Sequence, residues 1–399
     1  MRDVIVIGAG VSGCVTAEGL AARGFRTLLL EKKAAAGLDV CCTGIIGHEC
    51  LEMLNVAPLV RQEARGARFV APSGRSTCIQ RATPVAYILD RGELDRTLLS
   101  RAVQAGVEAQ FGARVLSLEP SARGVKVQFE QGGKKFSAES RYAVLATGYG
   151  SGLPRSLGFG KIDDHLAGAQ AVVTLKDPGE SAVDSAHETA LHRPSAEVRV
   201  LADQNLWPGG FAWLVPTGGG QGLAGLVTRG GDVRQLDTLL QRFKAQGLII
   251  STDCCRSYGP IPIRPRPRTG QDRLLVVGDA AGHVKPTTGG GIYYGALGAH
   301  IAVDVLTSEL SGQPASGIRT YQTRWQQRLN AEMRLGYFAQ KVWRRLQNPQ
   351  IESLFDLAMR HDMPDRIATS PRFSFDWHGP LLLETAQLLS LRQELRSWS

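Results

Sequence analysis

Three consecutive glycines, Gly289, Gly290 and Gly291, follow an apolar strand that ends at Asp279. Because glycine has no side chain, such a run lets a large ligand approach the main chain closely. A helix is expected from Ile292 through Asp304, and the free amide groups and dipole at its start would stabilise negative charge on a bound ring. An Asp at the end of the strand can hold a ligand hydroxyl. This segment therefore predicts a binding site for a large, electron-accepting ligand.

A second group of glycines lies near the N-terminus, where Gly8, Gly10 and Gly13 have the spacing GxGxxG. Gly8 permits a tight turn, Gly10 lets a pyrophosphate approach the backbone, and Gly13 lets the next helix pack on the strand. Glu31, which ends the following strand, would accept hydrogen bonds from an adenosine ribose. The motif alone does not separate NAD from FAD, since both contain ADP.

The elements around these residues form a strand–helix–strand unit. The apolar run Val4–Ile7 is typical of a central parallel strand, Val15–Leu20 continues as a helix, and Thr27–Leu30 forms the second strand. A distant buried strand, Leu274–Val277, leads into the glycine run described first. Two such cradles in one chain predict FAD, with Asp279 on a ribityl hydroxyl and the helix amides at the flavin pyrimidine ring.

The rest of the chain predicts an α/β fold with a Rossmann-type FAD-binding domain, an inserted β-rich substrate domain and a C-terminal helical tail. Further elements are a helix at Leu94–Ala105 and strands at Gly112–Leu118, Lys126–Glu130 and Tyr142–Leu145. The expected domains are residues 1–65 with 91–164 and 263–310 for FAD, residues 66–90 with 165–262 for substrate, and residues 311–399 for the helical region. Only one dinucleotide fingerprint is present, so the hydride donor must bind transiently.

Composition limits the classes of function. The 399 residues are 43% hydrophobic and 21% charged, and the net charge is +9. A positive charge fits nucleic acid, an anionic cofactor or an acidic membrane surface, but no basic run is interleaved with stacking aromatics, so we expect no nucleic-acid partner. The seven cysteines lack CxxC zinc spacing and a disulfide framework, which predicts reduced thiols and no metal. No run of eighteen apolar residues and no signal-peptide core are visible, so we expect a cytoplasmic protein.

Four motifs together resemble the geranylgeranyl reductase family of flavoproteins. They are GDAAG-x-x-x-P-x-x-GGGI, the N-terminal GxGxxG, the ATG at Ala146 to Gly148, and PGGFAWLVP at 208 to 216. The resemblance covers roughly residues 3 to 310 and implies a fold like that of p-hydroxybenzoate hydroxylase. It also implies an FAD-dependent enzyme that saturates carbon-carbon double bonds in an isoprenoid chain, such as a geranylgeranyl group or a prenylated lipid or quinone.

The resemblance also assigns site residues. Gly13 and Glu31 fall where the family grips the ADP end of FAD, and Cys41-Cys42-Thr43-Gly44-Ile45 matches its C-x-x-G-I loop, which approaches the flavin. The remaining matched residues are Arg91 for the diphosphate, Val115 for the adenine, and Asp279, Gly291 and Ile292 for the flavin ring and ribityl chain. The chain departs from the family at Cys42 and Thr43, where small or acidic residues are more usual, and at His283, where an aromatic is.

Alkene saturation delivers a hydride to one carbon and a proton to the other, so it needs a dry channel and a proton source. Cys41 is the first candidate for the proton source, with Cys42 beside it. The alternative is that both thiols only pack beneath the cofactor, as buried cysteines often do. Four aromatics are candidates for lining the channel or, alternatively, for ordinary core packing: Phe211, Trp213, Tyr293 and Tyr294.

Other chemistries are possible on the same fold. The stretch PGGFAWLVP is similar to the W-x-W-x-I-P motif of flavin halogenases, but those enzymes need a Lys after the first unit and this chain has none between Lys33 and Lys126. Halogenation is therefore disfavoured. An FAD-dependent aromatic-ring monooxygenase is the main alternative. A non-enzymatic prenyl-binding protein is a third, although the intact Asp279 and glycine series argue against it.

The electron donor would be NADPH or reduced ferredoxin, the latter an electron-donor protein partner. From Arg319 to Arg345 seven basic residues stand against the single acid Glu332, interspersed with apolar ones. This pattern predicts a basic amphipathic helix that either rests on the anionic cytoplasmic face of a membrane or packs its apolar side on the protein. A further amphipathic helix is expected at Leu381–Leu395.

Overall fold

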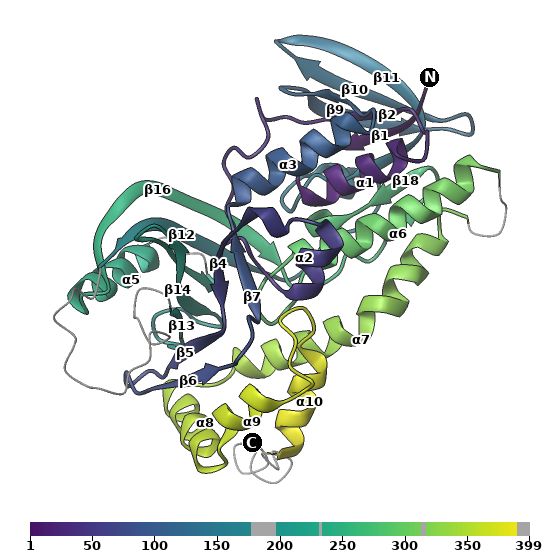
Figure 1. Ribbon diagram of the computed structural model, residues 1–399. Coiled ribbons are helices and arrows are strands. Elements are labelled where there is room, and N and C mark those ends of the chain that lie inside the picture. The colour runs from purple at the N-terminus through teal and green to yellow at the C-terminus, as the bar shows by residue number, and fades with distance from the viewer. Residues whose placement is uncertain (177–196, 231–233, 313–316, 389–399) are drawn as a thin grey trace. The chain divides into compact units, whose positions relative to one another are not determined.

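The computed structural model describes residues 1–176, 197–230, 234–312 and 317–388. The chain forms two compact units (Figure 1). Unit 1 comprises Met1–Val40, Arg91–His165 and Pro260–Tyr337, and unit 2 comprises Cys41–Asp90, Leu166–Gly259 and Phe338–Ser399.

Unit 1 is built on a parallel sheet whose strands follow the order β18-β11-β1-β2-β8. These strands are β18 (Leu274–Val276), β11 (Lys134–Leu145), β1 (Arg2–Ile7), β2 (Thr27–Leu30) and β8 (Glu108–Gln110). The edge strand β17 (Gly270–Gln271) and the antiparallel pair β9 (Arg114–Pro120) and β10 (Val125–Gln131) extend it. All four residues of β2 and the last four of β1 are buried, which explains the unbroken apolar runs. The predicted α/β class is confirmed.

Three helices stand beside this sheet: α1 (Val11–Ala21), α3 (Arg91–Gln104) and α6 (Ile292–Leu310). Helix α1 packs against both α3 and α6 (Figure 1). The approach of α1 to α6 is close, because a Cβ added at Gly19 would lie 2.9 Å from Val303 Cγ2. A short 3₁₀ turn, η5 (Gly278–Ala280), joins β18 to the loop before α6. Helices α1 and α6 therefore belong to one packed layer.

Unit 2 contains a seven-stranded sheet of order β16-β12-β15-β14-β13-β5-β6. Its strands are β16 (Ile249–Pro262), β12 (His165–Leu175), β15 (Gln221–Thr228), β14 (Phe211–Gly218), β13 (Val198–Leu201), β5 (Gly66–Val70) and β6 (Ser76–Gln80). Helix α5 (Arg234–Ala245) buries Leu236, Leu239 and Phe243 against one face of this sheet. We did not predict α5 within the β-rich stretch, although the spacing of its apolar residues is that of a helix.

The units divide the chain differently from the predicted domains. Residues 41–65 cluster with unit 2, because β3 (Ile45–Ile46) and β4 (Val60–Ala64) both pair with β7 (Ala86–Leu89). Helix α2 (His48–Leu54) follows β3. The C-terminal region is divided between the units. Its part in unit 2 contains α8 (Asn348–Arg360), α9 (Met363–Thr369) and α10 (Gly379–Leu388), and the end of the helix predicted to Leu395 lies outside the described residues.

Helix α7 (Thr320–Trp343) is the predicted basic amphipathic helix. Its apolar side is buried at Tyr321, Trp325 and Leu329, and the Trp325 indole donates a 2.8 Å hydrogen bond to Thr269. This part of the helix packs on the protein, which is the second of the two alternatives. Phe338 differs, since 63% of it is exposed. No helix within the described ranges is long and apolar enough to cross a membrane.

His283 lies in the interior of unit 1. Its ring centroid is 4.9 Å from that of Trp325 and 6.4 Å from that of Tyr321. A Cβ at Gly298 would lie 2.3 Å from His283 Nδ1, so this glycine of α6 makes room for the imidazole. None of the described groups hydrogen-bonds to either ring nitrogen. Burial lowers the pKa of His283 to about 3, so the ring is neutral in the folded protein.

This burial predicts a loss of stability at mildly acidic pH. An unfolded His, whose pKa is near 6.5, takes up a proton below that pH, whereas folded His283 does not until about pH 3. Between pH 7 and pH 5 the wild type should lose about 2 kcal/mol of unfolding free energy that a His283→Phe variant keeps. Urea denaturation at both pH values measures this, with exposed His361→Phe as control. An equal loss in His283→Phe would contradict it.

Candidate active site

The N-terminal glycine turn is tightly enclosed at two of its three glycines. Gly8 has a φ of +108°, and a Cβ there would lie 2.3 Å from the carbonyl oxygen of Ala146. A Cβ at Gly13 would lie 1.8 Å from the Gly8 oxygen. Gly10 differs, because a Cβ added there would have no protein atom within 4 Å. The protein itself therefore requires Gly8 and Gly13, and the space at Gly10 is open for a ligand's phosphates.

Glu31 is fixed at the end of β2. Its Oε2 accepts a 2.7 Å hydrogen bond from the Ala9 amide and its Oε1 a 2.9 Å bond from the Lys33 amide. The amide of Ala113 donates to the Glu31 carbonyl oxygen at 2.8 Å, which joins the segment before Val115 to the same strand end. The predicted ribose and adenine residues thus come from adjoining segments.

The second cradle forms around Asp279 and the start of α6. A Cβ at Gly291, the N-cap of α6, would lie 2.6 Å from Asp279 Oδ1, so only glycine leaves this carboxylate in place. The hydroxyl oxygen of Ser12 in α1 would lie 2.5 Å from a Cβ added at Gly278 and 2.6 Å from one added at Gly295. The two glycine motifs, distant in sequence, therefore meet in unit 1.

Asp279 and Arg91 interact electrostatically. Asp279 is reachable from solvent, but the protein atoms that surround it dehydrate its carboxyl and raise its pKa to about 6, while Arg91 opposes this rise. Arg91 itself binds Asp95, with Nη1 at 2.8 Å from Oδ1. Arg91 is thus brought near the Asp279 cradle, although its contact with a diphosphate remains a prediction.

In unit 2, the Cys41–Gly44 loop lies against β16. Cys41 is exposed, and its Sγ would lie 3.9 Å from a Cβ added at Gly259. The protein atoms around the thiol partly dehydrate it and raise its pKa, although the hydroxyl of Ser257 acts in the opposite direction. Gln170 Nε2 donates to the Cys42 carbonyl oxygen at 3.2 Å. The Leu89 amide donates to the Gly44 oxygen at 3.0 Å. Cys41 is therefore a protonated thiol at neutral pH, on a loop held from two sides.

Three paired residues lie in a row across the seven-stranded sheet of unit 2. Gln170 on β12 pairs with Gly225 on β15, which pairs with Trp213 on β14. A Cβ at Gly225 would lie 2.4 Å from the Trp213 ring, so only glycine leaves room for the indole here. The ring centroids of Phe211 and Trp213 are 5.8 Å apart. We did not predict Gln170 or Gly225, though a lone Gln in the apolar stretch LAGAQAVV is a usable signal.

The third predicted substrate residue, Tyr293, belongs to unit 1. It is 4% exposed on α6, beside fully buried Tyr294, with 6.1 Å between the ring centroids. Phe211 and Trp213 belong to unit 2. Within the described ranges, no group of three or more His, Cys, Asp or Glu residues could hold a metal ion.

Comparison with known proteins gives the family. A family model described as FAD binding domain matches residues 1–221. A digeranylgeranylglycerophospholipid reductase of Methanosphaerula palustris is 30% identical, over 76% of this chain and 77% of that protein. The chain belongs to the geranylgeranyl reductase family. Digeranylgeranylglycerophospholipid reductase 2 of Methanopyrus kandleri is 29% identical, over 90% of this chain and 91% of that protein.

The fold of this geranylgeranyl reductase family member is shared with a solved structure. A geranylgeranyl bacteriochlorophyll reductase-like protein from Thermoplasma acidophilum has a TM-score of 0.81 at 20% identity, over 99% of this chain and 98% of that one. With the open space at Gly10 and the carboxylate of Asp279 beside the α6 start, unit 1 fits FAD. The protein is an FAD-dependent oxidoreductase.

Replacing Asp279 by Ala should weaken the binding of FAD. A hydrogen bond to a charged group contributes about 1.5–3 kcal/mol, so the dissociation constant of FAD should rise about 10- to 100-fold. Fluorescence titration of the FAD-free protein measures it, with Asp304→Ala, an exposed acid in α6, as control. A fully yellow Asp279→Ala protein with an unchanged dissociation constant would count against the assigned contact.

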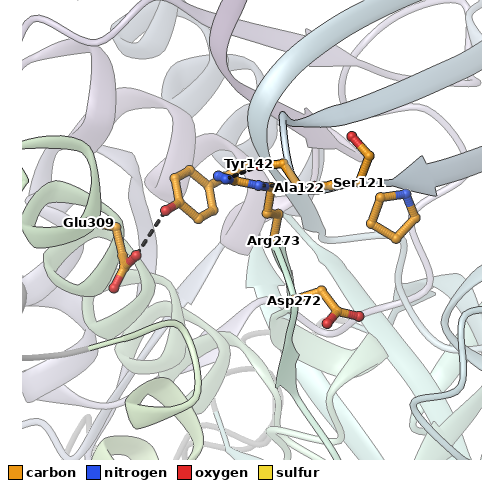
Figure 2. Close-up of a pocket in the computed structure, with 7 residues that line it drawn as sticks. Ser121, Ala122, Tyr142, Asp272, Arg273 and Glu309 are labelled. Carbon is orange, nitrogen blue, oxygen red and sulfur yellow. Dashed lines mark hydrogen bonds between the residues drawn. The ribbon is translucent and has the colours of Figure 1, made fainter.

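A surface pocket in unit 1 is distinct from the two glycine cradles (Figure 2). Tyr142 donates a 2.8 Å hydrogen bond to Glu309, and the Arg273 guanidinium lies 5.3 Å from the Tyr142 ring centroid. Glu309 is near the end of α6, a 19-residue helix about 28 Å long, whereas Gly291 is at its start. Arg273 donates to the carbonyl oxygens of Ser121 and Ala122. These contacts join β11 to the end of α6 and hold the turn between β9 and β10, so the polar residues of the pocket have structural roles.

Proposed function

We propose that this protein saturates carbon-carbon double bonds of an isoprenoid chain, using FAD. The observation that carries the proposal is the FAD cradle of unit 1, where space is open at Gly10 and the Asp279 carboxylate lies beside the start of α6. Cys41 offers a protonated thiol in the same chain. The similarity to two digeranylgeranylglycerophospholipid reductases supports a geranylgeranyl-type lipid or a related prenylated molecule as substrate.

Unit 1 would hold the cofactor through residues whose geometry is already fixed. Gly10 and the start of α1 receive the diphosphate, and Glu31 receives the ribose. Asp279 binds a ribityl hydroxyl and the start of α6 stabilises negative charge near the ring. When bound and reduced, FAD supplies a hydride to one carbon of the double bond.

The proton for the other carbon comes from unit 2 in this proposal. Cys41 donates the proton from Sγ, and the Ser257 hydroxyl stabilises the thiolate that remains. Cys42 holds the loop through its carbonyl oxygen, which Gln170 fixes. Phe211 and Trp213 offer flat apolar surfaces to the isoprenoid chain and exclude water from it.

The electron donor would bind transiently, either as NADPH or as a reduced ferredoxin. We also propose contact with the anionic cytoplasmic face of a membrane, where isoprenoid lipids are found. Phe338 near the end of α7 is exposed, as is Arg345 in the segment just after the helix. Both support this contact, because exposed apolar rings and exposed cations are each favoured at a lipid headgroup boundary.

Anaerobic photoreduction tests the proposed reaction. The purified, FAD-loaded protein is reduced by light and mixed with a geranylgeranyl lipid or with menaquinone, and flavin absorbance and product mass are followed. Reoxidation without oxygen, with a product about two mass units heavier, is the expected result, because two hydrogens are added. Reoxidation only with oxygen, with a product about sixteen units heavier, would instead identify a monooxygenase. A protein that binds the lipid but never takes up FAD would identify a prenyl carrier.

A further inference from the structure

Helix α2 begins without a capping side chain of its own. Its N-cap is Gly47, and the helix follows the Cys41–Gly44 loop and the two-residue strand β3. The first amides of a helix need an acceptor, which a Ser, Thr, Asp or Asn at the N-cap usually provides. Gly47 provides none.

A residue of the C-terminal region, Asp376, fills this role. Its Oδ2 accepts a 3.2 Å hydrogen bond from the Cys50 amide, 326 residues away along the chain. A Cβ at Gly47 would lie 2.3 Å from the same oxygen, so the carboxylate occupies the place where a capping side chain would stand. Asp376 is 2% exposed, and its charge also suits the positive end of the helix.

The loop that carries Asp376 is fixed at both ends. Ser374 Oγ accepts hydrogen bonds from the amides of Asp376 and Trp377, each at 3.1 Å. The Trp377 indole donates to Glu49 in α2 at 2.7 Å. On the other side, Arg81 donates to the carbonyl oxygens of Ile367 and Ser370. The carboxylate is therefore presented by a rigid turn.

The same loop also reaches the apolar cluster beside the Cys41–Gly44 loop. Phe375 packs in one cluster with Ile45, which directly follows the loop, and with Trp213. The Cys41–Gly44 loop thus has three supports in unit 2. Gln170 holds Cys42, Leu89 of β7 holds Gly44, and the C-terminal turn holds the start of α2 immediately beyond β3.

We propose that Asp376 is a positioning residue that fixes the Cys41–Gly44 loop by capping α2 from the C-terminal region. This inference rests on the proposed function for its catalytic consequence, because Cys41 is there the proton donor. Its structural content stands separately, since the cap would hold the loop that carries the exposed Cys41 thiol in place whatever reaction the protein performs.

The test measures the rate of iodoacetamide alkylation at Cys41 by peptide mass spectrometry in the FAD-loaded, full-length protein. Exposed Cys255 on β16 is the internal reference. Cys41 is exposed, so its alkylation rate depends on how far the folded loop raises the pKa of its thiol, because the thiolate is the reacting species. Loss of a cap costs about 1 kcal/mol, so Asp376→Ala should loosen the loop, lower this pKa and raise the Cys41 rate up to about fivefold, with the Cys255 rate unchanged. Asp376→Asn, which retains an acceptor oxygen, should give a smaller rise. Asp365→Ala, an exposed acid of α9 in the same region, should behave as wild type.

A double-mutant cycle with Gly47→Ala makes the test specific. Gly47→Ala alone should raise the Cys41 rate as Asp376→Ala does, because the new methyl displaces the carboxylate, and it should add little in an Asp376→Ala protein. Steady-state kinetics should show a lower kcat with KM and FAD content retained. An unchanged Cys41 rate in folded Asp376→Ala and Asp376→Asn proteins, or independent effects in the cycle, would overturn the proposal. If the alkylation rates change as expected but wild type reduces no alkene, the proposed function fails and the positioning role stands.

Discussion

Replacing Cys41 by Ala should slow alkene saturation about 100-fold while FAD stays bound. General acid catalysis by a positioned side chain contributes about 10²- to 10⁴-fold, and the FAD cradle lies in unit 1, which does not contain Cys41. Single-turnover reoxidation of the photoreduced protein by a geranylgeranyl lipid measures the step directly. The wild-type rate should also fall at alkaline pH, since the thiol proton is lost above a pKa that burial raises.

Cys255→Ala is the matched control, because Cys255 is an exposed thiol on β16, the strand that Cys41 adjoins. It should retain the wild-type rate. Unchanged turnover in Cys41→Ala would remove Cys41 from the mechanism, and the alternative that the cysteines only pack in the loop would then hold.

Substitutions at Gly13 and Gly10 in the N-terminal turn should affect protein stability and cofactor binding to different extents. Gly13→Ala places a methyl 1.8 Å from the Gly8 oxygen, which is backbone and cannot turn away, so unfolding free energy should fall by about 3 kcal/mol. Gly10→Ala meets no protein atom within 4 Å and has a φ of −77°, which any residue adopts. Its unfolding free energy in FAD-free protein should stay within about 0.5 kcal/mol of wild type.

FAD affinity should fall in both variants, though for different reasons. In Gly13→Ala the clash with the Gly8 oxygen distorts the turn that would hold the diphosphate. In Gly10→Ala the methyl occupies the space that the diphosphate needs, and the dissociation constant should rise at least about tenfold. Urea denaturation without FAD and fluorescence titration with FAD distinguish the two effects. A Gly10→Ala protein that binds FAD like wild type would contradict the assigned diphosphate position, and a fully stable Gly13→Ala protein would contradict the packing of α1 on the turn.

The FAD-binding unit was largely predictable because its requirements are local. Gly8, Gly10, Gly13 and Glu31 occupy one short strand–helix–strand unit, where spacing alone fixes which atoms meet. The cofactor site around Asp279 could be predicted for the same reason, since an acid at a strand end followed by glycines at a helix start is typical of such a site. The sequence did not predict the position of Ser12, which lies between the two motifs. Its position depends on the packing of α1, η5 and α6, which residue spacing alone does not describe.

Unit 2 was harder to predict because its contacts are non-local. Gln170 and Gly225 are brought next to Trp213 only by the pairing of β12, β15 and β14 in register. Asp376 caps a helix 326 residues away, and a capping search limited to the neighbours of Gly47 finds nothing. Helix α5 was overlooked because the surrounding strands dominate the composition of that stretch. The role of Cys41 stays a prediction that the kinetics above will decide.

The meeting of the two glycine motifs at Ser12 sets an order of events during synthesis. The first motif leaves the ribosome early, but Asp279 and Gly291 are made only when about three-quarters of the chain exists, and β18 must then insert beside β11. A nascent chain that stops before α6 can thus recognise at most the nucleotide half of the cofactor. We therefore expect flavin to be captured only after α6 has been made, and full-length protein without FAD to be more sensitive to proteases than FAD-loaded protein.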